Sequence, residues 1–240
     1  MLSKFSRLTT RVLKLPRCIS VCPTLAISVT YAVLSTYDRF AGLIHSDSRI
    51  EEIGMAARIE PLLTVADLDA CPDDNNRYEL IEGELSVSRA PGLPHQVVVQ
   101  NFQIAFVDYL RTNPIGRVVP GAGAIFSDYD AVIPDLAFVS NERWARIVSN
   151  DRFTAAHDLI VEVMSAGKEN RERDLLVKHQ LYAKYGVREY WIADTENRMV
   201  NVYVLRNNRL ENLAVLRDSD VVTSPLLPGF RMSVSSVFAQ

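Results

Sequence analysis

The sequence predicts an α/β sandwich in which helices cover a mixed sheet, and three observations support this fold class. Residues 95–113 and 169–185 carry apolar side chains at helical spacing. Several short runs rich in Val, Ile and Phe are typical of strands. One of them, residues 158–164, is apolar at successive positions, as a strand covered on both faces must be. The elements do not alternate regularly, which argues against a βαβ array.

The first elements along the chain are predicted from turn residues and periodicity. Residues 64–70 favour a short helix that ends in a polar turn. Residues 78–87 have the pattern of a hairpin that turns at residues 82–83. The first long helix spans residues 95–113 and closes before a proline. Its apolar positions recur at helical spacing and comprise Val98, Phe102, Ala105, Phe106 and Leu110.

The remaining elements are three strands, one helix and two further strands. Strand-like runs follow at residues 116–126, 132–139 and 158–164. A second long helix spans residues 169–185, with Leu175, Leu176 and Tyr182 expected on its inner side, and Gly186 ends it. Residues 189–194 and 199–205 are predicted to pair across a turn.

Composition is typical of a globular domain with a substantial core. The 240 residues include 48% hydrophobic and 23% charged residues, which suits one domain plus an extension. The cysteines, which are Cys18, Cys22 and Cys71, cannot form an even disulfide framework. We therefore expect a reducing compartment, the cytoplasm, and no stable membrane association.

Charge is unevenly distributed along the chain. Residues 1–54 contain seven Lys or Arg and four Asp or Glu, which leaves 19 basic and 25 acidic residues, a net charge of −6, in the remainder. That balance is poor for non-specific coating of DNA, where affinity comes from neutralising many phosphates. It is compatible with an enzyme that grips a short stretch of nucleic acid in one cleft.

Residues 1–54 are predicted to be an extension to a domain that spans residues 55–240. Its residues 4–17 contain five Lys or Arg, no acidic residue occurs before Asp38, and residues 18–34 are apolar but contain several Ser and Thr. It is too diluted for a membrane anchor and lacks the dense apolar centre of a secretory signal. An organelle transit segment fits the composition better. The alternative is a translated upstream stretch with the working start at Met55. Both alternatives predict an extension outside the folded core.

Two acidic residues interrupt apolar strands and are the strongest candidates for chemistry. Asp135 lies in Val-Ile-Pro-Asp-Leu-Ala-Phe-Val, and Glu162 lies in Leu-Ile-Val-Glu-Val-Met. A carboxylate in a buried strand is costly unless it is paired, hydrogen-bonded or bound to metal. Hard oxygen ligands without a His or Cys cluster favour Mg²⁺ or Mn²⁺ over Zn²⁺. The alternative is a pair of structural ion pairs with nearby Arg or Lys.

Lys178 is the predicted third member of this site. It shares one helix face with Asp174 and Tyr182, which lie four residues away on either side. From that face its ammonium could reach a water or a phosphate oxygen near the two acids. The alternative is a surface pair between Lys178 and Asp174.

Further polar residues are weaker candidates for the same pocket. His95 opens the first long helix and could contact phosphate or polarise a site residue, although a capping or exposed role is equally consistent. Glu79 and Glu84 on the hairpin are additional acids. Tyr190 and Trp191 are expected in the core rather than in a base-stacking platform. The cations expected to attract phosphate, if they are not merely solvated, are Lys168, Arg171 and Arg173.

Taken together, the segments resemble a known family. Tyr-Glu-Leu-Ile-Glu-Gly-Glu (78–84), Pro-Gly-Leu-Pro-His (91–95), Pro-Asp-Leu-Ala-Phe (134–138), Val-Glu-Val-Met-Ser (161–165), Asp-Leu-Leu-Val-Lys-His-Gln-Leu-Tyr (174–182) and Gly-Val-Arg-Glu-Tyr-Trp-Ile-Ala-Asp (186–194) occur in that order. They resemble the Uma-two family of restriction endonuclease-like proteins, within the PD-(D/E)XK superfamily. The resemblance covers residues 60–235 and implies a restriction-endonuclease-like mixed central sheet flanked by helices.

The resemblance also implies roles for individual residues. Asp135 and Glu162 would bind the metal, and a main-chain carbonyl such as that of Val163 would complete the site. The superfamily lysine usually stands two residues after the acid, where this chain has Met164. The resemblance implies that the lysine has moved to the second long helix, where Lys178 matches.

Three functions follow as hypotheses. The first is Mg²⁺- or Mn²⁺-dependent hydrolysis of phosphodiester bonds in DNA, in which a homodimer would supply the two sites that double-strand cleavage needs. The second is a catalytically inactive nuclease fold that binds nucleic acid or protein, which the acidic domain and displaced lysine favour. The third is hydrolysis of a small phosphate ester.

Overall fold

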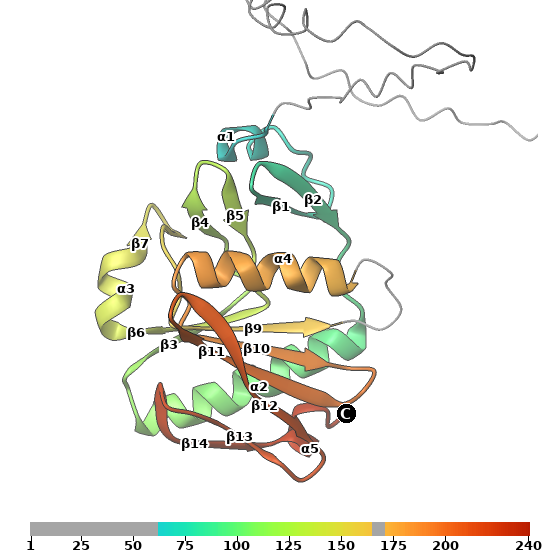
Figure 1. Cartoon of the computed structure of the whole chain (residues 1–240), viewed down its shortest axis with the longest axis vertical. Coiled ribbons are helices and arrows are strands. Elements are labelled where there is room, and N and C mark those ends of the chain that lie inside the picture. Colours follow the sequence, from blue (N-terminus) through green and yellow to red (C-terminus); the bar gives the residue numbers. More distant parts are fainter. Residues whose placement is uncertain (1–61, 165–170) are drawn as a thin grey trace, which may run out of the picture. The chain divides into compact units, whose positions relative to one another are not determined.

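A computed structural model describes residues 62–164 and 171–240, and the predicted extension at residues 1–54 lies outside these ranges. The described chain has two six-stranded mixed sheets and a small two-stranded sheet (Figure 1). The central sheet has the strand order β12-β11-β10-β9-β6-β3, and the second has the order β2-β1-β5-β4-β8-β7. The predicted α/β class with a mixed central sheet is confirmed, whereas the second sheet was not predicted.

The strands of the central sheet run from Gly116 to Arg217 in the sequence. Their bounds are β3 (Gly116–Pro120), β6 (Leu136–Ser140), β9 (Leu159–Met164), β10 (Glu189–Asp194), β11 (Met199–Arg206) and β12 (Arg209–Arg217). β9 and β10 pair in parallel, and the other neighbours pair antiparallel. β9 therefore lies in the interior of the sheet, between β10 and β6, which explains its uninterrupted apolar sequence.

The remaining strands are short and build the second and third sheets. Those of the second sheet are β1 (Arg77–Ile81), β2 (Glu84–Ser88), β4 (Ala124–Ser127), β5 (Asp130–Val132), β7 (Val148–Ser149) and β8 (Arg152–Phe153). β13 (Val221–Ser224) pairs with β14 (Leu227–Ser233). The predicted hairpin is β1–β2, and both turn residues, Glu82 and Gly83, have positive φ angles of 53° and 78°.

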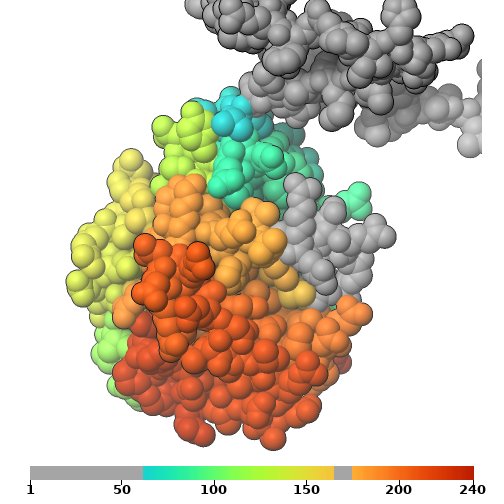
Figure 2. Space-filling model, in the orientation of Figure 1, coloured from blue at the N-terminus to red at the C-terminus, as the bar shows by residue number. Residues whose placement is uncertain are grey.

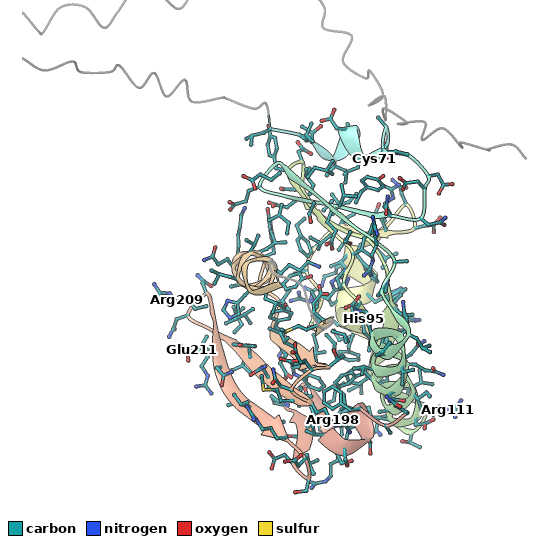
Figure 3. The ribbon with its side chains drawn as sticks, turned by 90° about the vertical axis from the view of Figure 1, so that its right-hand side faces the viewer. Cys71, His95, Arg111, Arg198, Arg209 and Glu211 are labelled. Atoms are coloured by element: carbon teal, nitrogen blue, oxygen red, sulfur yellow. The ribbon has the colours of Figure 1, made fainter. Side chains whose placement is uncertain are left out.

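Helices cover both faces of the central sheet. They are α1 (Val65–Leu68), α2 (Leu93–Thr112), α3 (Asn141–Ile147), α4 (Arg171–Lys184) and α5 (Val234–Val237). Phe102 and Phe106 of α2 pack with Trp191 on one face, whereas Leu181 and Tyr182 of α4 belong to the cluster on the other face. Figure 3 shows α2 and α4 on opposite sides of the strands.

The outer surface of one face is formed by the second half of the chain. In Figure 2, side chains of α4 and of the strands β11 and β12 cover much of the side that faces the viewer. Leu176 of α4 is 59% exposed, so its predicted inward position is wrong. In the described ranges, no helix is both long and apolar enough to span a membrane.

Two predicted strands are each divided by the tertiary structure. The run at residues 116–126 becomes β3 and β4 because Gly121, with a φ angle of 59°, turns the chain from the central sheet into the second sheet. The run at residues 132–139 becomes β5 and β6, and Pro134 lies in the break. α3 was missed, although Ser140 at its N-cap accepts a hydrogen bond from the Arg143 amide.

Gly116 on β3 is expected to be intolerant of a side chain. A Cβ atom there would lie 2.4 Å from the Val139 carbonyl oxygen and 2.5 Å from the Phe138 ring. Gly116→Ala should therefore lower the free energy of unfolding by about 1–3 kcal/mol through overpacking. Urea unfolding followed by tryptophan fluorescence measures this loss. Gly123→Ala is the matched control, since no described atom lies within 4 Å of its added Cβ; equal losses in both variants would contradict the packing argument.

Candidate active site

Side chains from both six-stranded sheets and from α2 and α4 meet beside the carboxyl-terminal half of β9. The hairpin strand β1 supplies two residues, the β5–β6 connection supplies one, and β9 supplies one. α2 contributes one side chain from its first turn, and α4 contributes two that lie four residues apart on one face. These side chains are Arg77, Glu79, His95, Asp135, Glu162, Lys178 and Tyr182.

Asp135 is the hub of one half of this cluster. Its Oδ1 accepts a hydrogen bond from Arg77 Nη1 at 2.8 Å. Its Oδ2 lies 3.0 Å from His95 Nε2 and accepts the amide of Val163 at 2.9 Å. Burial alone would raise the pKa of Asp135, but the hydrogen bonds from these three partners outweigh it and hold the pKa well below its ordinary value. Asp135 is therefore an ionised carboxylate.

His95 orients Asp135 from the first turn of α2. An ionised carboxylate only accepts hydrogen bonds, so the proton between the two side chains belongs to His95 Nε2. The His95 side chain is buried, and Nδ1 has no partner among the described residues. Figure 3 shows His95 near the end of α2 that lies closest to the hairpin. The residue is thus neither exposed nor the N-cap, which is Gly92.

Lys178 is the hub of the other half. Its Nζ donates to Glu79 Oε1 at 3.0 Å and to Glu162 Oε1 at 3.1 Å. Burial alone would lower the pKa of Lys178, yet the two carboxylates raise it above its ordinary value, so the ammonium stays charged. Glu79 is held in turn by the Ile133 amide, which donates to Oε1 at 2.7 Å. The lysine therefore bridges two acids that lie on different sheets.

Glu162 is a buried acid on the interior strand β9. Burial raises the pKa of Glu162 to about 7, and the charge of Lys178 opposes the rise. The Tyr182 hydroxyl donates to Oε1 at 2.6 Å, which fixes the carboxylate beside Lys178. Because Val163 binds Asp135 through its amide, the Glu162–Val163 peptide joins the two halves of the cluster. Asp135, Glu162 and Lys178 consequently form one connected network.

The structure brings together most of the residues selected from the sequence. Asp135, Glu162, Lys178, Glu79 and His95 belong to the network, in which ion pairs are also present. Their catalytic roles stay predictions. The remaining acid, Glu84, lies exposed at the start of β2 opposite Ile81. Lys168 and the side chains of Arg171, Arg173 and Asp174 fall outside what the structure describes.

Sequence reasoning missed Arg77 and assigned no role to Tyr182. Strand alternation offered a signal for Arg77, because it lies two residues before Glu79 on β1 and therefore points to the same side of the strand. The helix face shared with Lys178 offered one for Tyr182. Tyr190 and Trp191 are fully buried, and Trp191 Nε1 donates to Glu189 Oε2 at 3.1 Å. The prediction that these two aromatics belong to the core is confirmed.

The donor set suits a hard divalent ion. Within residues 62–164 and 171–240, no group of three or more His, Cys, Asp or Glu side chains has the arrangement of a ready-made metal site. Mg²⁺, however, is commonly held by one or two carboxylates and keeps several waters. Val163 lies beyond the last residue pair of β6 and β9, Leu136 with Val161, and its amide points to Asp135. The N–H and C=O groups of one strand residue point to the same side of the strand. The Val163 carbonyl therefore points to the side of β9 on which Asp135 lies.

The mixed central sheet with helices on both faces is a restriction-endonuclease-like fold. The model of the Uma2 family, described as "putative restriction endonuclease", matches residues 65–235. The chain therefore belongs to the Uma2 family and is a nuclease-type protein.

Solved structures show the same fold. The chain is similar to a "putative nuclease belonging to DUF820" from Anabaena variabilis ATCC 29413, with a TM-score of 0.63 and 19% sequence identity. The match covers 73% of this chain and 97% of the other. At this identity the likeness concerns the fold alone. A comparison with curated proteins finds no match.

Proposed function

We propose that this protein is a metal-dependent endonuclease that hydrolyses phosphodiester bonds in DNA. Asp135, Glu162 and the Val163 carbonyl would hold Mg²⁺ or Mn²⁺. The observation that carries the proposal is the pair of buried carboxylates, Asp135 and Glu162, beside a charged Lys178 whose Nζ lies 3.1 Å from Glu162. When bound, the divalent ion supplies a Lewis acid that lowers the pKa of water and offsets charge on the phosphorane-like transition state.

The protein's own side chains would orient the reactants. Lys178 Nζ is a charged donor that would orient the attacking water or a non-bridging phosphate oxygen. Glu79 and the Ile133 amide behind it hold the lysine in place. Tyr182 fixes Glu162, and His95 fixes Asp135, so both acids keep one orientation. Each side chain that would contact the substrate or the ion is thereby held in position by a neighbouring side chain that contacts neither.

Cleavage of supercoiled plasmid and of branched DNA with Mg²⁺ or Mn²⁺ tests the proposal. We expect Asp135→Asn and Glu162→Gln each to lower the cleavage rate by about 100-fold or more, the range seen when one group that stabilises transition-state charge is removed. Asp108→Asn and Glu211→Gln are matched controls, because both carboxylates are exposed and lie in surface ion pairs. Cleavage that survives the loss of Asp135 would sink the mechanism.

The alternative is a catalytically inactive nuclease fold that binds nucleic acid or protein. Two observations favour it: Arg77 and Lys178 already neutralise the acids of the cluster, and the described ranges contain no group of three or more side chains arranged as a metal site. Calorimetric titration of the protein with Mn²⁺ distinguishes the two functions. Heat of binding that disappears in Asp135→Asn supports the nuclease, and no binding to the unmodified protein, with or without a phosphodiester present, supports the alternative.

A further inference from the structure

Arg77 pairs with the oxygen of Asp135 that accepts no other hydrogen bond among the described residues. Oδ2 already lies against His95 Nε2 and the Val163 amide, which uses both of its acceptor positions. Oδ1 carries the Arg77 guanidinium at 2.8 Å. A divalent ion that binds Asp135 must therefore use Oδ1, directly beside a fixed positive charge. Like charges at such separation repel strongly in a partly buried site.

The surroundings of Arg77 allow it to leave, in contrast to those of Lys178. The Arg77 side chain is 27% exposed, whereas that of Asp135 is 5% exposed. Asp135 would still be held by His95 and Val163 after the guanidinium moved, so its orientation would persist. Lys178 is 15% exposed and lies between two carboxylates, which keeps it in place. Arg77 is thus the more exposed of the two cations of the network and pairs with a single carboxylate.

We propose that Arg77 holds Oδ1 of Asp135 against divalent ions until a phosphodiester draws the guanidinium away. Arginine suits this exchange, because its planar fork pairs with phosphate as well as with carboxylate. The substrate phosphate then takes the guanidinium, and the carboxylate becomes available to the metal ion. Metal binding and phosphate binding are coupled, and each strengthens the other by the same factor. This inference rests on the proposed function.

Calorimetric titration of the full-length protein with Mn²⁺ tests the role of Arg77. The neutral variants Arg77→Gln and Arg77→Met remove the charge, and Arg77→Lys keeps it as the matched control. We expect the neutral variants to bind Mn²⁺ about tenfold more tightly than the unmodified protein, a difference of about 1.4 kcal/mol. Arg77→Lys should stay near the unmodified protein. Thermal unfolding of each variant identifies those that fold, and either neutral variant suffices.

A second titration measures the coupling. Dimethyl phosphate, the smallest phosphodiester, is added at fixed concentration before Mn²⁺. It should tighten Mn²⁺ binding to the unmodified protein several-fold more than to the neutral variants, because only the former has a guanidinium to displace. An equal effect on both would show that the phosphate acts without Arg77 and would overturn the proposal.

Asp135→Asn separates failure of this inference from failure of the proposed function. If the neutral variants bind Mn²⁺ no more tightly than the unmodified protein, while Asp135→Asn abolishes binding, the metal site stands and the role of Arg77 is wrong. If Asp135→Asn binds Mn²⁺ as the unmodified protein does, or if no form binds it, the proposed metal site is wrong and the inference falls with it.

Discussion

Lys178→Met is expected to lower the free energy of unfolding by about 3–5 kcal/mol, because it leaves buried charges without their partner. The ammonium donates to both Glu79 and Glu162, whose side chains are 10% and 9% exposed. Methionine fills similar volume but supplies no charge and no donor. Both carboxylates would then be buried with one fewer counter-charge. Among the described residues, Glu162 would keep only its hydrogen bond from Tyr182. Urea unfolding at pH 8.5, above the pKa of about 7 of Glu162, measures the loss.

Lys184→Met on the same helix is the matched control. Lys184 is 49% exposed, and its partner Asp130 also accepts bonds from Tyr185 and Ser127. Its loss should cost less than about 1 kcal/mol, because the ammonium is half in solvent and the buried Asp130 keeps its other hydrogen bonds. Adding Glu162→Gln to Lys178→Met should recover part of the stability, since it removes one of the unpaired charges. A loss in Lys178→Met no larger than in the control would contradict the argument.

Acidification from pH 6.5 to pH 4 is expected to cost about 3 kcal/mol of stability through His157 alone. The side chain is fully buried, and its ring nitrogens have no hydrogen-bond partner among the described residues. Burial lowers the pKa of His157 to about 4, and the nearby charge of Arg143 adds to the effect, against the opposing charge of Asp158. The neutral ring is therefore the form that the folded protein accepts.

The direction of the change in stability with pH follows from proton binding by His157 in the folded and unfolded states. The unfolded chain protonates this histidine near pH 6.5, whereas the folded protein does so only near pH 4. Below pH 6.5 the unfolded state gains protons that the folded state cannot take, so stability falls until pH 4 is reached. Above pH 6.5 the residue has no effect on the pH dependence.

Unfolding at pH 7.5, 5.5 and 4.5 compares the unmodified protein with His157→Phe. The replacement keeps a ring beside Phe153, whose centroid lies 4.5 Å from that of His157, but it cannot titrate. The variant should lose less stability on acidification than the unmodified protein, whatever its stability at pH 7.5. Parallel pH profiles for the two proteins would show that His157 is not the group responsible.

Much of the fold could be predicted from local signals. The hairpin turn and the end of α4 each need a residue that tolerates positive φ, and the sequence supplies Gly83 and Gly186 there. The buried strand β9 was predicted because it is apolar on both faces. The division of residues 116–126 into β3 and β4 was not, because each piece by itself has the composition of a strand. Only pairing with different sheets separates them.

The candidate site could likewise be predicted only in part. Asp135 and Glu162 could be selected from the sequence because an acid within an apolar strand must find a compensating partner. The identity of those partners could not. Lys178 and Glu79 are 99 residues apart, and Arg77 and Asp135 are 58 apart, so their contacts depend on how the two sheets and α4 pack.

By itself, the sequence determined the class of fold, the two buried acids and the lysine expected beside them. The reason is that the residue types of a short segment indicate its burial and its periodicity. Only the tertiary structure decided which charged side chains pair with one another. Arg77 meets Asp135, and Lys178 joins Glu79 to Glu162, since β1 of one sheet is brought against β9 of the other. An ion pair depends on distances of a few ångströms between remote segments, and no local pattern specifies such distances.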